Sequence, residues 1–172
     1  ENCHSQVTLA PLSSAFFLFE GWAKNLVHDL KYNAQFWVLD FLDEFIKKSK
    51  VDVTGLDLVV PVALHVRRLR ERGYNQSALL ARLWSRHLKC DFCPEVLARV
   101  IDTPSQTGLS RAARQINVKD AFVVKNPKMI FDRSILLVDD VRTTGATLDE
   151  AARVLCEAGA QQVQTWSVAM VL

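Results

Sequence analysis

The feature that most constrains the fold is the stretch from Ile135 to Thr147, which joins an apolar segment to two acids and a small, hydroxyl-rich loop. Residues 135–138 are all apolar and partly β-branched, a pattern typical of a strand covered on both faces of a parallel sheet. Apolar residues then recur at helical spacing from Leu148 to Leu155. Because ligands of open α/β sheets bind at the carboxyl ends of the strands, this stretch predicts an α/β fold with a ligand site after residue 138.

The loop from Thr143 to Thr147 has the composition of a phosphate-binding loop. Its residues are small enough for backbone N–H groups to approach an anion, and its three threonines offer hydroxyl donors. The helix that follows adds unpaired N–H groups and a positive partial charge at its N-terminus. Asp139 and Asp140 only accept hydrogen bonds when ionised, so they suit a sugar diol or a divalent cation beside the phosphate. A ribose 5-phosphate presents both halves of this chemistry.

Three other interpretations of the two acids are considered. An ATPase strand end is excluded because no G-x-x-x-x-G-K-[ST] loop occurs in the chain. A phosphorelay receiver carries its acids near the start of the domain and needs later elements, whereas here only a short segment follows Asp140. The acids could instead cap the next helix, which is a common use of Asp, but two acids and three threonines exceed what a cap requires.

Composition and charge narrow the class of protein. With 172 residues and 49% hydrophobic residues, the chain suits a single globular domain over residues 1–172, with N-terminal helices over about 1–50 and a core over about 51–172. The formal net charge of +2 does not by itself require a nucleic-acid or membrane partner. The apolar runs are too short to cross a bilayer, and no secretion signal is evident. A cytoplasmic location without membrane insertion is therefore expected.

The four cysteines are expected to be free thiols, because their number is low for a disulfide framework. Cys90 and Cys93 have the spacing of zinc ligands, but a structural zinc site needs four donors and only Cys3 and His4 could complete it. No metal site within the chain is predicted, and Cys90 and Cys93 are assigned to a helix-to-strand connection.

The rest of the chain alternates helical and extended patterns. Amphipathic helices are predicted at residues 20–32 and 36–46, and further helices at 77–88, 110–116 and after Thr147. Strands are predicted at 56–60, ended by Pro61, and at 96–101, 121–124, 134–138 and 163–171. Residues 65–73 are assigned to a basic loop. This order predicts a mostly parallel sheet flanked by helices.

The acid pair and the loop resemble the phosphoribosyl pyrophosphate signature of type I phosphoribosyltransferases. Within that superfamily the chain is similar to the ComF group, associated with competence and DNA utilisation, from about Phe19 onward. The residues that carry the likeness are Glu20-Gly21, Leu30-Lys31-Tyr32, Pro61-Val62, Arg72-Gly73-Tyr74-Asn75-Gln76, Gln106, Leu109-Ser110, Arg114, Asn117-Val118 and Ala121-Phe122. The resemblance implies a central mostly parallel sheet with a small N-terminal helical hood.

The resemblance also implies roles for residues. The acids, which are the candidate catalytic residues, would hold the ribose hydroxyls, and the phosphoribosyl site would comprise Asp139, Asp140, Val141, Arg142, Thr143, Thr144, Gly145, Ala146 and Thr147. The loop Pro61 to Leu64 would hold pyrophosphate, with a strained cis peptide at Val62 or Ala63. A flexible loop carrying Arg67, Arg68 and Arg72 would close over the pyrophosphate and exclude water. Mg²⁺ would accompany phosphoribosyl pyrophosphate as the cofactor.

Two features depart from the family pattern. ComF-like proteins often begin with a four-cysteine zinc module, of which only Cys3 could be a remnant here; either the sequence starts after that module or the protein lacks it. Arg142 stands where the signature more often has an apolar or aromatic residue. The arginines at 67–72 could simply form a solvated face.

Three functions are open at this point: a phosphoribosyltransferase, a sensor that binds phosphoribosyl pyrophosphate or a nucleotide without turnover, and a partner of single-stranded DNA or of DNA-processing proteins. The sequence does not identify the acceptor of the phosphoribosyl group or the roles of Gln106, Arg114 and Asn117. The oligomeric state is also open, and a homo-oligomer is one possibility.

Overall fold

The molecule is built around a five-stranded parallel sheet with the strand order β1-β7-β6-β2-β3. The computed structural model describes residues 13–48, 55–103 and 111–171. The strands of the sheet are β1 (Ser13–Leu18), β7 (Gln162–Met170), β6 (Ser134–Arg142), β2 (Leu58–Pro61) and β3 (Asp91–Phe92). The predicted α/β class with a mostly parallel sheet flanked by helices is confirmed.

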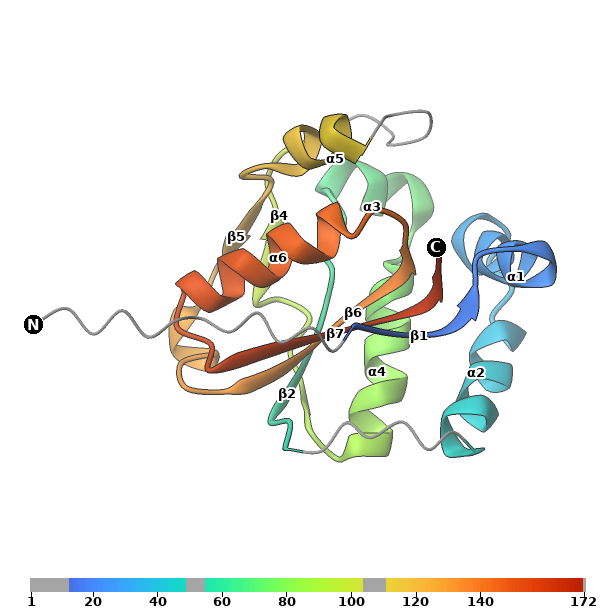
Figure 1. Ribbon diagram of the computed structural model, residues 1–172. Coiled ribbons are helices and arrows are strands. Elements are labelled where there is room, and N and C mark those ends of the chain that lie inside the picture. Colours follow the sequence, from blue (N-terminus) through green and yellow to red (C-terminus); the bar gives the residue numbers. More distant parts are fainter. Residues whose placement is uncertain (1–12, 49–54, 104–110, 172) are drawn as a thin grey trace, which may run out of the picture.

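Helices lie on both faces of this sheet (Figure 1). The chain contains α1 (Gly21–Tyr32), α2 (Trp37–Lys48), α3 (Val66–Arg72), α4 (Gln76–Leu88), α5 (Arg111–Val118), α6 (Ala146–Glu157) and a 3-10 turn, η1 (Pro127–Met129). A separate antiparallel pair consists of β4 (Leu97–Arg99) and β5 (Phe122–Val124). In Figure 1, α6 and the β4–β5 pair lie on one side of the sheet, whereas α4, α1 and α2 lie on the other.

Two hydrophobic cores hold these layers together, one on each face of the sheet. Side chains of β6 alternate between them, with Ile135 and Leu137 in the core under α6 and Leu136 and Val138 in the core under α4. All four side chains are at most 1% exposed. A strand covered on both faces reads as a continuous apolar run, which is why residues 135–138 identify this strand from the sequence alone.

Strand β6 extends further than the apolar run predicts. It continues to Arg142 and pairs in parallel with β7 as far as Met170. Asp139 and Asp140 therefore lie within the last part of the strand and not in the turn after it. The loop that remains between β6 and α6 is Thr143 to Gly145, which is shorter than predicted.

The basic segment predicted as a loop is a helix, and that prediction is wrong. Helix α3 is capped at its start by His65, whose Nδ1 accepts a hydrogen bond from the Arg67 backbone N–H at 3.4 Å. Gly73 ends it with a φ of 82°, the left-handed conformation in which helices commonly terminate. The intervening Arg, Leu and Glu residues are good helix formers, and Arg67 pairs with Glu71 one turn later.

Three smaller details also differ from expectation. Pro61 is the last residue of β2 and does not stop the strand before it. The edge strand β1 was not predicted. No peptide bond among the residues that the structure describes is cis, so the expected cis peptide at Val62 or Ala63 is absent there.

Candidate functional site

The two acids of β6 lie at the carboxyl end of the sheet and are almost completely covered. Asp139 is 9% exposed and Asp140 is 3% exposed. Asp139 Oδ1 accepts hydrogen bonds from Ser77 Oγ at 2.8 Å and from the Asp140 backbone N–H at 2.9 Å. Asp140 Oδ1 forms an ion pair with Lys31 Nζ at 2.9 Å. The expected site needs carboxylates that a sugar can reach, and here both are turned towards protein groups.

Burial and mutual repulsion change the proton affinity of this cluster. Desolvation, followed by the nearby Asp140 carboxylate, raises the pKa of Asp139 to about 7. Burial lowers the pKa of Lys31, but the carboxylates of Asp140 and Asp139 raise it by more, so the pKa of Lys31 lies above its ordinary value. Lys31 is therefore protonated at neutral pH and compensates charge at the acid pair. Asp140 Oδ2 is buried without a hydrogen-bond partner.

The loop between β6 and α6 retains the features of an anion site, but it is partly covered. Gly145 precedes α6 with a φ of 86° and has no side chain to cap the helix, while Thr144 Oγ1 accepts a hydrogen bond from the Ala146 N–H at 3.4 Å. The acids therefore do not serve as the cap of α6. A Cβ placed on Gly145 would lie 3.0 Å from Asp149 Oδ2 and 3.2 Å from Arg142 Nε, so both side chains lie over the glycine. The guanidinium of Arg142 brings a positive charge, and the carboxylate of Asp149 a negative charge, to the place where the phosphate is expected.

The loop after β2 is fixed to the acid pair by a short chain of hydrogen bonds. The Val62 N–H donates to the Val138 carbonyl of β6 at 2.8 Å. Asn75 Nδ2 donates to the Val62 carbonyl at 3.0 Å, while Asn75 Oδ1 accepts from the Ser77 N–H and caps α4. Ser77 in turn binds Asp139. Val62 and Ala63, the predicted pyrophosphate residues, are 4% and 9% exposed. The hydrogen bonds of Val62 to Val138 and to Asn75 hold this loop in place.

The three predicted arginines have separate environments. Arg67 is 66% exposed and pairs with Asp102 at 2.9 Å and with Glu71 at 3.4 Å. Arg68 donates to the Thr103 carbonyl at 2.7 Å. Arg72 donates to Gln76 Oε1, and its guanidinium carbon lies 5.2 Å from the centre of the Tyr32 ring. Of the three, Arg68 and Arg72 line a cavity that Lys31 also lines, whereas Arg67 does not.

This smaller cavity, of about 480 Å³, links α1 to α3. Its lining is mainly cationic and aromatic: Lys31, Tyr32, Ala34, Arg68, Glu71, Arg72 and Tyr74. Tyr74 donates its hydroxyl to the Leu30 carbonyl at 2.5 Å and so holds the end of α1 in place. Lys31 belongs both to this cavity and to the ion pair with Asp140, and it therefore connects the two.

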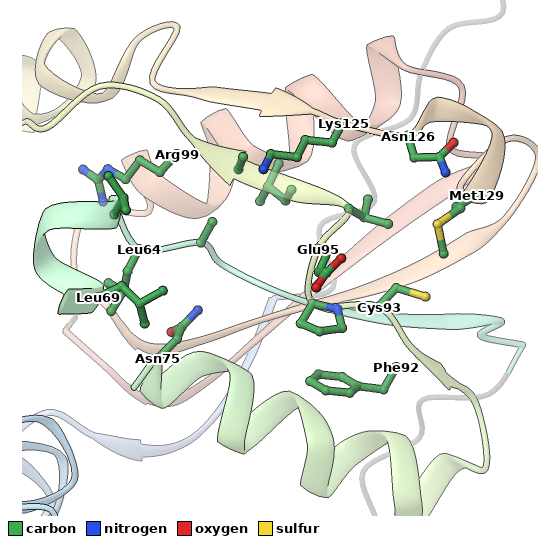
Figure 2. A pocket seen from close by; sticks show the side chains of 16 residues that line it. Leu64, Leu69, Asn75, Phe92, Cys93, Glu95, Arg99, Lys125, Asn126 and Met129 are labelled. Atoms are coloured by element: carbon green, nitrogen blue, oxygen red, sulfur yellow. The ribbon is translucent and has the colours of Figure 1, made fainter. Parts of the chain in front are cut away.

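A larger cavity of about 820 Å³ lies between α3, α4 and the β4–β5 pair (Figure 2). Figure 2 shows Leu64 and Leu69 on one side of it, with Arg99 nearby, and Lys125, Asn126 and Met129 on the far side. Ala63 and Asn75 also line it, but neither acid of β6 does. The acids do not line the smaller cavity either, but Lys31 lines it and pairs with Asp140.

Comparison with known proteins assigns this arrangement to a family. A profile described as phosphoribosyl transferase domain matches residues 75–170, more than half of the chain. Competence protein F of Haemophilus influenzae is 34% identical over 151 residues, covering 84% of this chain, and DNA utilization protein YhgH of Escherichia coli is 36% identical over 153 residues, covering 86%. The chain belongs to the ComF group of the phosphoribosyltransferase family. It spans only 66% of the length of these two relatives.

A third relative matches over a smaller share of both chains. Competence protein ComFC of Bacillus subtilis is 35% identical over 132 residues, which cover 70% of this ComF-group chain and 45% of that protein. The part of the chain that the structure describes contains no helix long and apolar enough to cross a membrane. Cys90, Cys93 and Cys156 are free thiols, and Cys3 and His4 lie outside the described residues.

Sequence reasoning missed several residues of this ComF-type site. Lys31, Ser77 and Asn75 contact the acids or the loop after β2, and none had an assigned role. Lys31 and Asn75 do fall within segments that carry the family resemblance, which is the one signal that could have indicated them. Of the residues with open roles, Arg114 and Asn117 lie on α5, and Gln106 is outside the described residues.

The residues present do not form a magnesium site of their own. Among the described residues no group of three or more His, Cys, Asp or Glu side chains could hold a metal ion. Mg²⁺ prefers near-octahedral oxygen coordination, usually with substrate phosphates as ligands. One of the two acids here is already paired with Lys31. Mg²⁺ therefore does not fit the acid pair as a protein-held ion.

Proposed function

We propose that this chain binds phosphoribosyl pyrophosphate and transfers its phosphoribosyl group to a nitrogen nucleophile. The observation that carries the proposal is the placement of an acid pair at the carboxyl end of β6, directly before the N-terminus of α6, with Lys31 joining it to a cavity lined by cations. A phosphoribosyl pyrophosphate molecule has a 5-phosphate, a ribose diol and a diphosphate in a corresponding order. The family membership supports the same ligand class.

In this proposal each part of the ligand has its own partners. The 5-phosphate binds at Thr143 to Thr147, where the N-terminal amides of α6 and the Arg142 guanidinium donate to its oxygens. The ribose hydroxyls donate to Asp139 and Asp140. Because Ser77 and Lys31 now occupy these carboxylates, ligand binding requires these side chains to give way or to share the oxygens.

The diphosphate binds in the smaller cavity, where Arg68 and Arg72 donate to its oxygens. As the bond from C1 to the leaving oxygen breaks, negative charge grows on the diphosphate, and fixed cations stabilise it more strongly at that stage. Mg²⁺ would enter with the diphosphate, which supplies the oxygen ligands that the acid pair lacks, and would neutralise part of its charge. The nitrogen nucleophile forms its bond to C1 as the diphosphate leaves.

Isothermal titration calorimetry with phosphoribosyl pyrophosphate and Mg²⁺ tests the proposal. We expect measurable binding to the wild-type protein and loss of that binding in the Asp139→Asn, Asp140→Asn double variant, because amides cannot provide the same charge-assisted acceptors. A matched control, Asp40→Asn with Asp132→Asn, changes two exposed acids and should bind as the wild type does. Equal affinity in the wild type and the Asp139/Asp140 variant would reject the proposal.

A second candidate is a role without turnover, as a sensor or as a partner in DNA processing. The names of the relatives, which refer to competence and DNA utilization, favour it. As a sensor, the protein would bind the ligand but release no pyrophosphate with any base. As a DNA partner, it would use Arg67 on the exposed face of α3, and affinity for single-stranded DNA would fall steeply with salt. A cytoplasmic location and a homo-oligomeric state stay predictions.

A further inference from the structure

Lys31 occupies an unusual position for a surface-helix lysine. It lies in the last turn of α1, and its ammonium is 2.9 Å from Asp140 Oδ1, a carboxylate whose side chain is only 4% exposed. The Lys31 side chain is itself 23% exposed, and that residue lines the 480 Å³ cavity together with Arg68 and Arg72. Lys31 therefore meets the acid pair on one side and the cavity on the other.

A counterion for Asp140 alone would not need this placement. An ammonium carries three N–H donors, and the structure gives one ion pair, to Asp140. The other lining residues of the cavity carry two further positive charges and one negative charge, on Glu71. Since an anion in this cavity meets Arg68 and Arg72 from α3, Lys31 is the cation that faces it from the opposite side, from α1.

The end of α1 is also held firmly, so Lys31 is a positioned group. The Leu30 carbonyl accepts the Tyr74 hydroxyl at 2.5 Å, and Leu30 itself is only 1% exposed. Tyr32, the next residue, stacks with the guanidinium of Arg72 at 5.2 Å. These contacts tie α1 to α3 and to Tyr74 on both sides of Lys31, and they fix the backbone from which Lys31 reaches the acid pair.

We propose that Lys31 binds the diphosphate of phosphoribosyl pyrophosphate while it remains paired with Asp140, and that it thereby replaces a protein-held metal ion between the acid pair and the leaving group. This inference rests on the proposed function and adds a substrate-contacting residue from the N-terminal helices. It also joins the ribose end of the site to its diphosphate end through one side chain.

The test compares ligands that share the ribose phosphate but differ in the diphosphate. Binding of ribose 5-phosphate and of phosphoribosyl pyrophosphate is measured by calorimetry for the wild type, Lys31→Met and Lys31→Arg. We expect Lys31→Met to weaken phosphoribosyl pyrophosphate by about 10- to 100-fold, the range of a charge-assisted hydrogen bond, and ribose 5-phosphate by less than about 3-fold. Lys31→Arg should recover most of the loss.

Lys24→Met is the matched control, because Lys24 is an exposed lysine on the same helix. It should leave both affinities unchanged. If Lys31→Met weakens the two ligands equally, Lys31 only supports Asp140 and the inference is wrong. If it weakens neither, Lys31 does not contact the ligand. A wild-type protein that binds neither ligand would instead contradict the proposed function itself.

A second pair of variants covers the case in which Lys31→Met alone fails to fold with Asp140 unpaired. Asp140→Asn is compared with Asp140→Asn, Lys31→Met, which removes both charges together, and the ligand is inorganic pyrophosphate, which has no ribose. We expect the double variant to bind pyrophosphate about 10-fold more weakly than Asp140→Asn does. Equal binding would overturn the assignment of Lys31 to the diphosphate.

Discussion

The acid pair of β6 and the arginines of α3 carry opposite charges and are held in opposite ways. Asp139 and Asp140 are buried, and their partners come from α4 and α1 at 2.8 and 2.9 Å. Arg67 of α3 is 66% exposed and forms ion pairs with both Glu71 and Asp102. A buried charge depends on one fixed partner, whereas an exposed charge can exchange partners at little cost. The difference indicates which half of the site has a fixed backbone and which half adjusts.

The half with the fixed backbone is the ribose end, although a ribose must displace Ser77 and Lys31 or share the carboxylate oxygens with them. Its hydrogen-bond chain runs from Val62 through Asn75 and Ser77 to Asp139, so the loop after β2 and the acid pair keep a fixed relative position. The adjustable half is the diphosphate end, where the Arg68 side chain is 30% exposed and is bound to the Thr103 carbonyl. A bound anion would replace the Thr103 carbonyl as the acceptor for Arg68, because a hydrogen bond between two charged groups is stronger.

Removal of Asp140 should have the largest effect on stability. Asp140→Leu leaves the Lys31 ammonium without its carboxylate, and we expect the free energy of unfolding to fall by about 2 to 3 kcal/mol, less than for a fully buried pair because Lys31 is partly exposed. Glu71→Leu, at the exposed end of α3, should change it by less than about 1 kcal/mol. Urea denaturation measures both values. Equal effects would mean that burial does not distinguish the two regions.

Stability should also depend on pH through Asp139. Its pKa is raised from 3.8 to about 7, so the folded protein keeps a proton on this group in a range where the unfolded chain has lost it. The resulting stabilisation is complete below about pH 4 and is lost as the pH rises to about 7, at no more than about 1.4 kcal/mol per pH unit. Denaturation of the wild type and of Asp139→Asn at several pH values should show this decrease only in the wild type. The same decrease in the Asn variant would assign it to another group.

The smallest expected effect is a difference in ligand affinity between variants of two neighbouring arginines. Arg68→Ala should weaken phosphoribosyl pyrophosphate by about 10-fold, because Arg68 lines the smaller cavity, whereas Arg67→Ala should weaken it by less than about 3-fold. Calorimetry at fixed salt compares the two, since exposed charges are screened. A larger loss for Arg67 would show that α3 changes its orientation when the ligand binds.

The sequence predicted the helices and strands whose hydrophobic pattern lies within one continuous segment. The run 135–138 and the helices at 20–32 and 36–46 follow from hydrophobic period alone, and all are confirmed. The helix at 66–72 was missed because Gly73 and the run of arginines were interpreted as a loop, although Gly73 is its C-terminal cap. Helix capping by His65 depends on side-chain geometry and leaves no clear pattern in the sequence.

The candidate site shows the same division. Asp139, Asp140 and the loop to Thr147 are contiguous, and the sequence identified them as a group. Lys31 and Ser77 reach Asp140 and Asp139 from 109 and 62 positions away in the sequence, through the packing of α1 and α4 on the sheet. The burial of the acids could not be foreseen for the same reason, since the groups that cover them come from distant helices.

The central claim is that a phosphoribosyl ligand binds at the end of β6 and the start of α6. A crystal structure of the protein soaked in ribose 5-phosphate measures it directly. We predict phosphate density at Thr143 to Thr147 beside Arg142, with the ribose hydroxyls within hydrogen-bond distance of Asp139 or Asp140. A ligand bound elsewhere, such as in the larger cavity lined by Arg99 and Lys125, with the acids still closed by Ser77 and Lys31, would contradict the account.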